Sequence, residues 1–342
     1  MKNSILFVSL LASGMLLSGC SDPVDRAQPV LISEAVPYDT DDPAIWIHPT
    51  DPAQSLVLGT DKGCDTDQGG LYVFRLDGTI DRERSFIPLN RPNNVDIAYN
   101  MVMGTDTLDI AVVTVRRENT IRVFSLPDMT PIDNGGISVF DGEVDRDPMG
   151  ISLFTDLETG TIFAMVGRKL GPSGSYIWQY ELIDSGEGYV TGNVVRQFGQ
   201  FSGLKEIEAM VSDNELGYFY ASDEGFGVRK YYAHPDSSSE ELATFALDNV
   251  KDDHEGLSIY KNQDGTGYLI LSDQQGQRFN LYTREGDNSY LRSVPTMAVE
   301  SDGNEITDVG LNTNFPNGLF VAMSDDKTFQ FYRAEDIIGT NE

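Results

Sequence analysis

Short apolar runs, separated by Gly, Asp, Asn and Pro, recur along the chain from about residue 30 to its end. No stretch keeps a helical spacing of apolar residues over four turns. Short runs bounded by turn-forming residues are typical of β-strands. The pattern therefore predicts an all-β protein.

The apolar runs form a repeat in which an apolar residue stands three positions before an aromatic residue. The six copies are at 71–74, 121–124, 177–180, 228–231, 279–282 and 329–332. Their closing aromatic residues are 50, 56, 51, 51 and 50 positions apart. A second apolar run precedes each copy, at 56–58, 110–113, 162–165, 218–221, 268–271 and 319–322. A third precedes that one, at 44–47, 95–98, 151–154, 209–211, 257–260 and, more weakly, 309–311.

Three strands that recur six times predict a six-bladed β-propeller over residues 30–342. Two separate β-sandwiches are the alternative, but they would not keep one period along the whole chain. The last repeat ends at residue 332 and lacks an outer strand. We expect residues 30–36 to supply that strand, which would close the ring and cover an exposed edge.

The first 20 residues have the pattern of a bacterial lipoprotein signal peptide. Lys2 precedes an apolar run at 5–17, which ends in the lipobox-like sequence LSGC at 17–20. In this interpretation Cys20 is lipidated and residues 21–29 form a tether. The protein would then be exported and anchored to a bacterial membrane on its periplasmic or cell-surface side. Ordinary signal-peptide cleavage nearby is the alternative.

The amino-acid composition excludes several classes of function. The chain has 54 acidic and 24 basic residues, a formal charge of −30, three His and two Cys. An acidic surface is the opposite of what nucleic acids require. Two cysteines cannot form a zinc cluster, and no HExxH, GxSxG or Walker motif is present. We expect a monomer that touches a membrane only through its lipid.

Acidic residues recur where the first strand of several blades begins. The candidate metal ligands at these positions are Asp41, Asp42, Asp96, Glu208, Asp253, Glu255 and Asp302, and Glu224, which follows the second strand of blade four, is a further candidate. First strands line the channel of a propeller, so these oxygen atoms would meet at one mouth. Clustered carboxylates repel one another unless a cation lies among them, and several hard oxygen ligands suit Ca²⁺. A solvated acidic rim is the alternative.

Basic residues follow the second strand in blades one to three. They are Lys62, Arg116, Arg117, Arg168 and Lys169. Blades four to six carry acidic residues at this position instead. We predict that the five basic residues bind phosphate groups. Ordinary surface salt bridges are the alternative.

Several segments together resemble the β-propeller phytases, the alkaline calcium-dependent phytase family. They are DDPAIWIHP at 41–49, GTDK at 59–62, GGLYVF at 69–74, NNVDI at 93–97, EAM at 208–210, DHEGLSIY at 253–260, GYLI at 267–270 and FPNGLFV at 315–321. The resemblance implies a six-bladed propeller that removes phosphate from inositol hexakisphosphate. It also implies that calcium bridges carboxylates and substrate phosphates and activates a water molecule.

Carried over by position, Lys62, Arg116 and Lys169 match phosphate-binding residues of the family. Asp41, Asp42, Glu208, Glu224, Asp253, Glu255 and Asp302 match calcium-site acids or their neighbours. Two positions depart from the family pattern. Met149 stands where the family usually has Tyr, and Leu170 stands where it tends to have Glu. A thioether cannot donate a hydrogen bond to phosphate.

The sequence therefore predicts a calcium-dependent phosphomonoester hydrolase acting on phytate or a related ester. Its catalytic residues would be Glu208, Glu255, Lys62 and Arg116. Two alternatives stay open. One is a non-catalytic lipoprotein that binds calcium-complexed phosphorylated ligands, which Met149 and Leu170 would favour. The other is a lactonase-type propeller, which uses central calcium but needs no cluster of cations.

Overall fold

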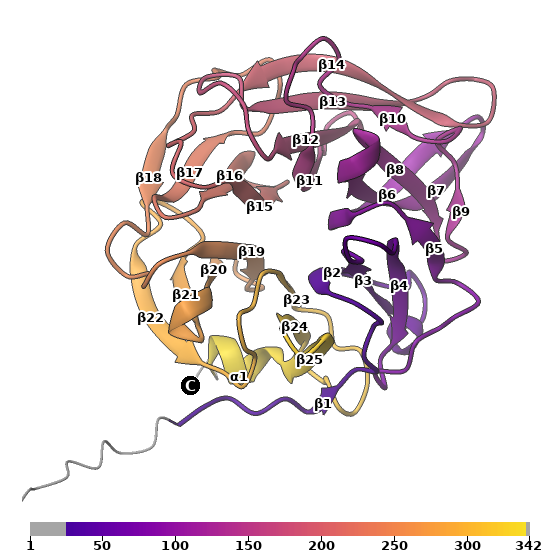
Figure 1. Ribbon diagram of the computed structural model, residues 1–342. Helices are drawn as coiled ribbons and strands as arrows, with labels where there is room; N and C mark the ends of the chain where they lie inside the picture. Colours follow the sequence, from indigo (N-terminus) through magenta and orange to yellow (C-terminus); the bar gives the residue numbers. More distant parts are fainter. Residues whose placement is uncertain (1–24, 340–342) are drawn as a thin grey trace, which may run out of the picture.

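Six antiparallel sheets are arranged in a ring around a central axis (Figure 1) in the computed structural model, which describes residues 25–339. Blade one contains β2 (Thr40–Trp46), β3 (Leu56–Asp61), β4 (Gly69–Arg75) and β5 (Phe86–Leu89). Blade two contains β6 (Pro92–Met103), β7 (Asp106–Val115), β8 (Thr120–Leu126), β9 (Thr130–Pro131) and β10 (Ile137–Ser138). Blade three contains β11 (Pro148–Thr155), β12 (Ile162–Arg168), β13 (Ile177–Asp184) and β14 (Val190–Phe198).

The second half of the ring repeats the same order. Blade four contains β15 (Ile207–Asp213), β16 (Tyr218–Asp223), β17 (Gly227–Tyr232) and β18 (Ala243–Phe245). Blade five contains β19 (His254–Lys261), β20 (Gly267–Asp273), β21 (Arg278–Thr283) and β22 (Tyr290–Pro295). Blade six contains β23 (Asn304–Thr307), β24 (Leu319–Ser324), β25 (Thr328–Arg333) and β1 (Leu31–Ile32). A short helix, α1 (Ala334–Ile338), follows. The predicted six-bladed propeller is confirmed.

The two ends of the chain meet in blade six. Leu31 pairs with Phe331 and Ile32 with Gln330, and the amides of Val30 and Ser33 continue the hydrogen bonding. The segment expected to close the ring does so, although the regular ladder is only two residues long. No helix within residues 25–339 is long and apolar enough to cross a membrane.

The expected boundary between tether and propeller is too late. Arg26 already donates hydrogen bonds to the carbonyls of Gln277 and Thr296, and Ala27 forms a β-bridge with Thr296. Contact with the blades therefore begins at Arg26 rather than at residue 30. The signal peptide and Cys20 lie outside the described residues.

The first strand of blade six is also corrected. It is Asn304–Thr307, not the run at 309–311. Leu311 instead packs with Phe315 in the core between blades six and one. The apolar pattern marked this packing segment because three of the four strand residues are polar.

The repeating aromatic residues lie on the third strands, where they fill the space between neighbouring blades. Phe74, Phe124, Tyr180, Tyr231, Tyr282 and Tyr332 are all buried. Phe74, for example, packs edge-on against Phe329 of blade six, with ring centroids 5.4 Å apart. One large ring per blade at the same position therefore explains the period of about 51 residues in the sequence.

A β-bulge interrupts the first strand of five blades. In each, two residues of the first strand face one residue of the second. The bulged pairs are Asp41–Asp42, Asn93–Asn94, Met149–Gly150, Glu208–Ala209 and Glu255–Gly256. In blade one the hydroxyl of Thr60, opposite the bulge, accepts the hydrogen bond of the Asp42 amide at 2.9 Å. The bulges therefore place one large side chain from each of these five blades at the start of the channel.

Candidate active site at the channel mouth

The residue that follows the second strand has the same backbone position in four blades. The amides of Lys62, Arg116, Lys169 and Glu224 donate hydrogen bonds to the carbonyls of Asp39, Arg91, Asp147 and Glu206, at 2.7, 2.9, 2.9 and 3.0 Å. Each of these carbonyls lies just before a first strand. The four side chains are thus anchored beside the bulges, at one mouth of the channel.

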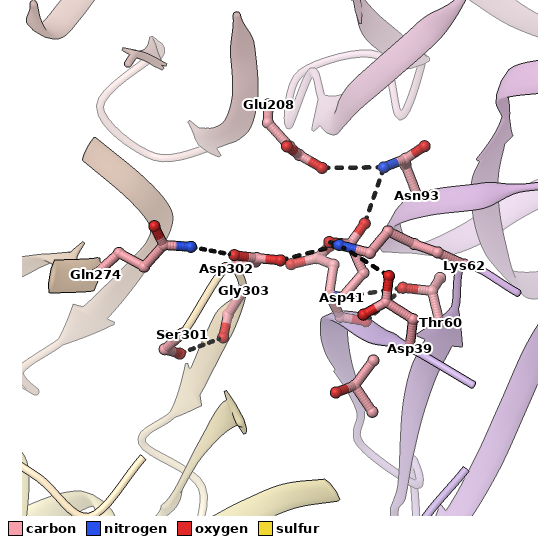
Figure 2. Close-up of polar contacts among 12 residues, drawn as sticks. Asp39, Asp41, Thr60, Lys62, Asn93, Glu208, Gln274, Ser301, Asp302 and Gly303 are labelled. Carbon is pink, nitrogen blue, oxygen red and sulfur yellow. Dashed lines mark hydrogen bonds and ion pairs between the residues drawn. The ribbon is translucent and has the colours of Figure 1, made fainter. Parts of the chain in front are cut away.

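Lys62 is the centre of the polar network in Figure 2. Its Nζ lies 3.0 Å from Asp41 Oδ1, 3.0 Å from Asp302 Oδ2 and 3.7 Å from Asp39 Oδ2. Burial disfavours the charged ammonium, but the carboxylates of Asp41 and Asp302 outweigh it and raise the pKa of Lys62. Lys62 is therefore a permanent cation joining blades one and six.

Two amide side chains extend this network to three other blades. Asn93 Nδ2 donates to Asp41 Oδ2 and to Glu208 Oε1, both at 3.0 Å. Gln274 Nε2 donates to Asp302 Oδ1 at 2.5 Å (Figure 2). Because the acceptors are carboxylate oxygens, these bonds fix side chains of different blades relative to one another.

Two groups of carboxylates meet beside the network. One oxygen from each of Glu206, Glu208 and Glu224 lies within 4.8 Å of the others, and the same holds for Glu224, Asp253 and Glu255. Burial, followed by repulsion from Glu206, raises the pKa of Glu224 to about 8. Burial and the neighbouring Glu224 also raise the pKa of Glu255 well above its ordinary value.

These acidic residues fit a hard cation. Glu224 Oε1 and Glu255 Oε2 are buried and have no hydrogen-bond partner among the described residues. A buried carboxylate oxygen without a partner is costly, and a divalent cation would supply the missing contact. Glu208, Glu224, Asp253 and Glu255 could therefore hold calcium, with Asp41 and Asp302 on the adjoining network.

Asp42 and Asp96, both predicted metal ligands, lie away from these groups. Asp42 Oδ2 accepts the amide of Val95 at 3.0 Å, and Asp96 Oδ2 accepts the amide of Leu153 at 2.6 Å. Both carboxylates line the channel interior beside Glu305. The structure thus places them deeper than the mouth, and each bonds to the backbone of the next blade.

The predicted phosphate-binding residues also separate into two kinds. Arg116 contacts the sulfur of Met149 and forms no ion pair within residues 25–339. Lys169 contacts the carboxylate of Glu206. Arg117 is half-exposed and lies 3.7 Å from the carboxylate of Asp65. These three basic residues are accessible near the mouth.

The prediction for Arg168 is wrong. Its side chain is 0% exposed and its guanidinium bonds to Glu143 at 3.0 Å and to the carbonyls of Asp145 and Ser175. It also lies over the ring of Phe140. Strand residues alternate between faces, so Arg168 points into the blade while Lys169 points to the mouth.

Sequence reasoning missed Glu206, Lys205 and Gln274. Lys205 contacts the carboxylate of Asp253, and Glu206 joins one of the two acidic groups. A usable signal was present, because Glu206 precedes Glu208 by two residues just as Asp39 precedes Asp41.

The fold and the mouth together define a class: β-propellers whose channel entrance combines buried carboxylates with lysine and arginine side chains. The chain belongs to the phytase family, since the Phytase family model matches residues 26–334. The curated 3-phytase of Bacillus subtilis (strain 168) is 34% identical over 300 residues, which cover 82% of this chain and 73% of that protein. These findings confirm the family inferred from the motifs and make the chain an enzyme, a phosphoric monoester hydrolase.

Solved structures show the same fold in distant proteins. The WD40 β-propeller domain of Doa1 is 9% identical, with a TM-score of 0.50, covering 90% of this chain and 97% of that chain. A luciferin-regenerating enzyme is 13% identical, with a TM-score of 0.50, covering 89% and 95%. At these identities the likeness concerns the propeller architecture alone.

Proposed function

We propose that the chain hydrolyses phosphomonoesters of phytate, or of a related phosphate ester, with calcium held at the channel mouth. The observation that carries the proposal is the meeting of buried carboxylates from blades four and five with Lys62, Arg116 and Lys169 at one mouth. Membership of the phytase family and the relative named 3-phytase support the reaction class.

The basic residues would bind and orient the phosphate groups. Arg116 is the strongest candidate, because its guanidinium has no carboxylate partner among the described residues and its Nε is buried without a hydrogen bond. A guanidinium can bind two phosphate oxygens at once. Lys62 is fixed between Asp41 and Asp302, so its charge is already in place to offset charge that develops in the transition state.

The acidic residues would hold the cation. Glu208, Glu224, Asp253 and Glu255 provide its oxygen ligands, and Asn93 orients Glu208. Bound calcium would attract phosphate oxygens and lower the pKa of nearby water. A chain with a formal charge of −30 repels a polyanion at a distance, so the local positive charge at the mouth has to provide the attraction.

Phosphate release from phytate by the purified protein tests this function. We expect release in millimolar calcium and none in EGTA. Arg116→Ala should lower kcat/KM about ten- to a hundredfold, because it removes one charge-assisted contact. Arg82→Ala, which removes an exposed guanidinium paired with Glu34, is the control and should leave the rate unchanged. Release that is insensitive to EGTA would contradict the calcium requirement.

One observation favours the binder alternative. Met149 occupies a bulge position of the ring and contacts Arg116 through sulfur, where a hydroxyl could have donated to phosphate. Calorimetry with phytate separates the two functions, because a binder would show calcium-dependent association without phosphate release. Met149→Tyr should raise the rate of the enzyme and should give a binder no activity.

We also propose that the protein is exported and lipid-anchored. The sequence LSGC at 17–20 supports this, and these residues lie outside the described residues. Cys20→Ser should move the protein from the membrane fraction to the soluble fraction of the cell envelope. Wild-type protein in the soluble fraction would contradict the anchor.

A further inference from the structure

Glu206 lies between the phosphate-binding and the acidic parts of the mouth. It stands just before β15, two residues ahead of the bulge residue Glu208. Its backbone carbonyl accepts the amide of Glu224 at 3.0 Å, which fixes its backbone beside the second strand of the same blade. The position is therefore set by main-chain bonding and not by a mobile loop.

The Glu206 carboxylate lies near one positively charged and two negatively charged side chains. One oxygen contacts the ammonium of Lys169 in blade three. An oxygen also lies within 4.8 Å of carboxylate oxygens of Glu208 and Glu224. Three carboxylates this close repel one another strongly, and a single lysine at their edge cannot balance them.

A second observation shows that this group is arranged for a ligand. Glu224 is 5% exposed, and its Oε1 has no hydrogen-bond partner among the described residues. The same Glu224 belongs to the second group, with Asp253 and Glu255. A buried oxygen left without a donor, between two sets of carboxylates, is what a bridging ligand of a cation requires.

We propose that Glu206 is a calcium ligand, shared between a cation at the Glu206–Glu208–Glu224 group and the ammonium of Lys169. This inference rests on the proposed function. The calcium ion and the Lys169 ammonium compete for the same carboxylate. Calcium binding therefore weakens the ion pair between Glu206 and Lys169. The lysine is then free to bind a substrate phosphate, and the cation and phosphate sites are coupled through one side chain.

Calorimetric titration of the full-length protein, in detergent, with calcium chloride and without any phosphate compound tests this role. Glu206→Gln should weaken calcium binding roughly ten- to a hundredfold, the effect of losing one charged contact. Lys169→Met should tighten calcium binding a few-fold, because it removes the competing charge. If the pair of Glu206 and Lys169 only supported the fold, both variants would lose calcium affinity to the same extent.

Two reference variants make the outcomes distinguishable. Glu208→Gln reports on the cation site itself, and Glu215→Gln, which removes a carboxylate paired with Lys261 outside the mouth, should titrate like wild type. If Glu208→Gln binds calcium weakly while Glu206→Gln binds like wild type, the role of Glu206 is wrong and the proposed function survives. If neither variant changes the titration, the cation site and the proposed function both fail.

Folding is checked separately. Thermal unfolding in EGTA should give Glu206→Gln a melting temperature within a few degrees of wild type, since the pair with Lys169 is partly exposed. Should Glu206→Gln not fold, Glu206→Asp keeps the charge on a shorter side chain and should bind calcium measurably more weakly. Wild-type affinity in Glu206→Asp would overturn the proposal.

Discussion

Two adjacent residues at the end of the second strand in blades one, three and four face different surroundings: one bonds within its blade and the next points to the mouth. Asp61 accepts the amides of Asp39 and Gly63, both at 2.9 Å, while Lys62 points to the mouth. Arg168 and Lys169 divide in the same way, as do Asp223 and Glu224. The sequence identifies the two adjacent polar residues in each blade. Which of them faces the mouth depends on where the alternation of the strand begins, and composition alone cannot show that.

Arg168 and Lys169 should therefore differ in a stability measurement. Arg168→Ala removes the three hydrogen bonds of a fully buried guanidinium, so it should cost about 3 kcal/mol of unfolding free energy. Lys169→Ala should change stability by less than about 1 kcal/mol but lower kcat/KM. Denaturant unfolding and phosphate release measure the two effects. Equal stability losses would contradict the division of tasks.

The carboxylates at the mouth make the stability of the folded chain fall as the pH rises. Burial raises the pKa of Glu224 to about 8 and that of Asp302 to about 7, so the folded chain binds their protons more tightly than the unfolded chain. Their stabilising contribution is full near pH 4 and is lost as the pH rises toward 8. In EGTA the melting temperature should fall between pH 5 and 8, and Glu224→Gln should reduce that fall.

At the scale of the element, the β-bulge determines the site. A period-two pattern predicts the first strand of five blades, yet it gives the wrong face for residues beyond a bulge, since the extra residue reverses the alternation. Glu206 and Lys205 were missed for a different reason: they precede β15 and its bulge, so no strand pattern assigns them a face. The bulge of blade three also needs a glycine: a Cβ on Gly150 would lie 1.9 Å from the carbonyl oxygen of Glu208.

Gly150→Ala tests the importance of this close approach. The added methyl group pushes against the backbone of Glu208 in the next blade, so we expect a loss of about 1–3 kcal/mol in stability and a larger loss in calcium affinity. Gly167→Ala is a milder control, because its Cβ would lie 3.1 Å from the carbonyl oxygen of Ile207. Calorimetry and thermal unfolding measure both variants. Unchanged calcium affinity in Gly150→Ala would show that the bulge geometry does not define the site.

At the scale of the whole molecule, the polar network at the mouth adds to the apolar packing and the hydrogen bonds that join neighbouring blades. Lys62, Asn93 and Gln274 link side chains of blades one, two, four, five and six. The aromatic repeat was sufficient to predict the ring, because every blade uses the same packing position. It could not predict these links, since they join residues far apart in sequence.

Calcium should therefore stabilise the entire ring. A ligand that binds only the folded chain adds about 2.7 kcal/mol when its free concentration is 100 times Kd. Thermal unfolding in millimolar calcium should show a clearly higher melting temperature than in EGTA, and Glu255→Gln should reduce the difference. Superimposable unfolding curves would argue against any calcium site.

The closure of the ring by β1 has a consequence for biosynthesis. Ser33 bonds to Phe329 across 296 residues, so the first strand of the propeller stays unpaired until the last one is available. Five blades can form from strands that are already present, whereas the sixth stays open until the end of the chain is available to fold. A chain that stops before β25 leaves an unpaired strand at each end of an incomplete ring. The pairing of β1 with β25 thus distinguishes complete from truncated chains, because a truncated chain exposes free strand edges that proteases and chaperones can bind.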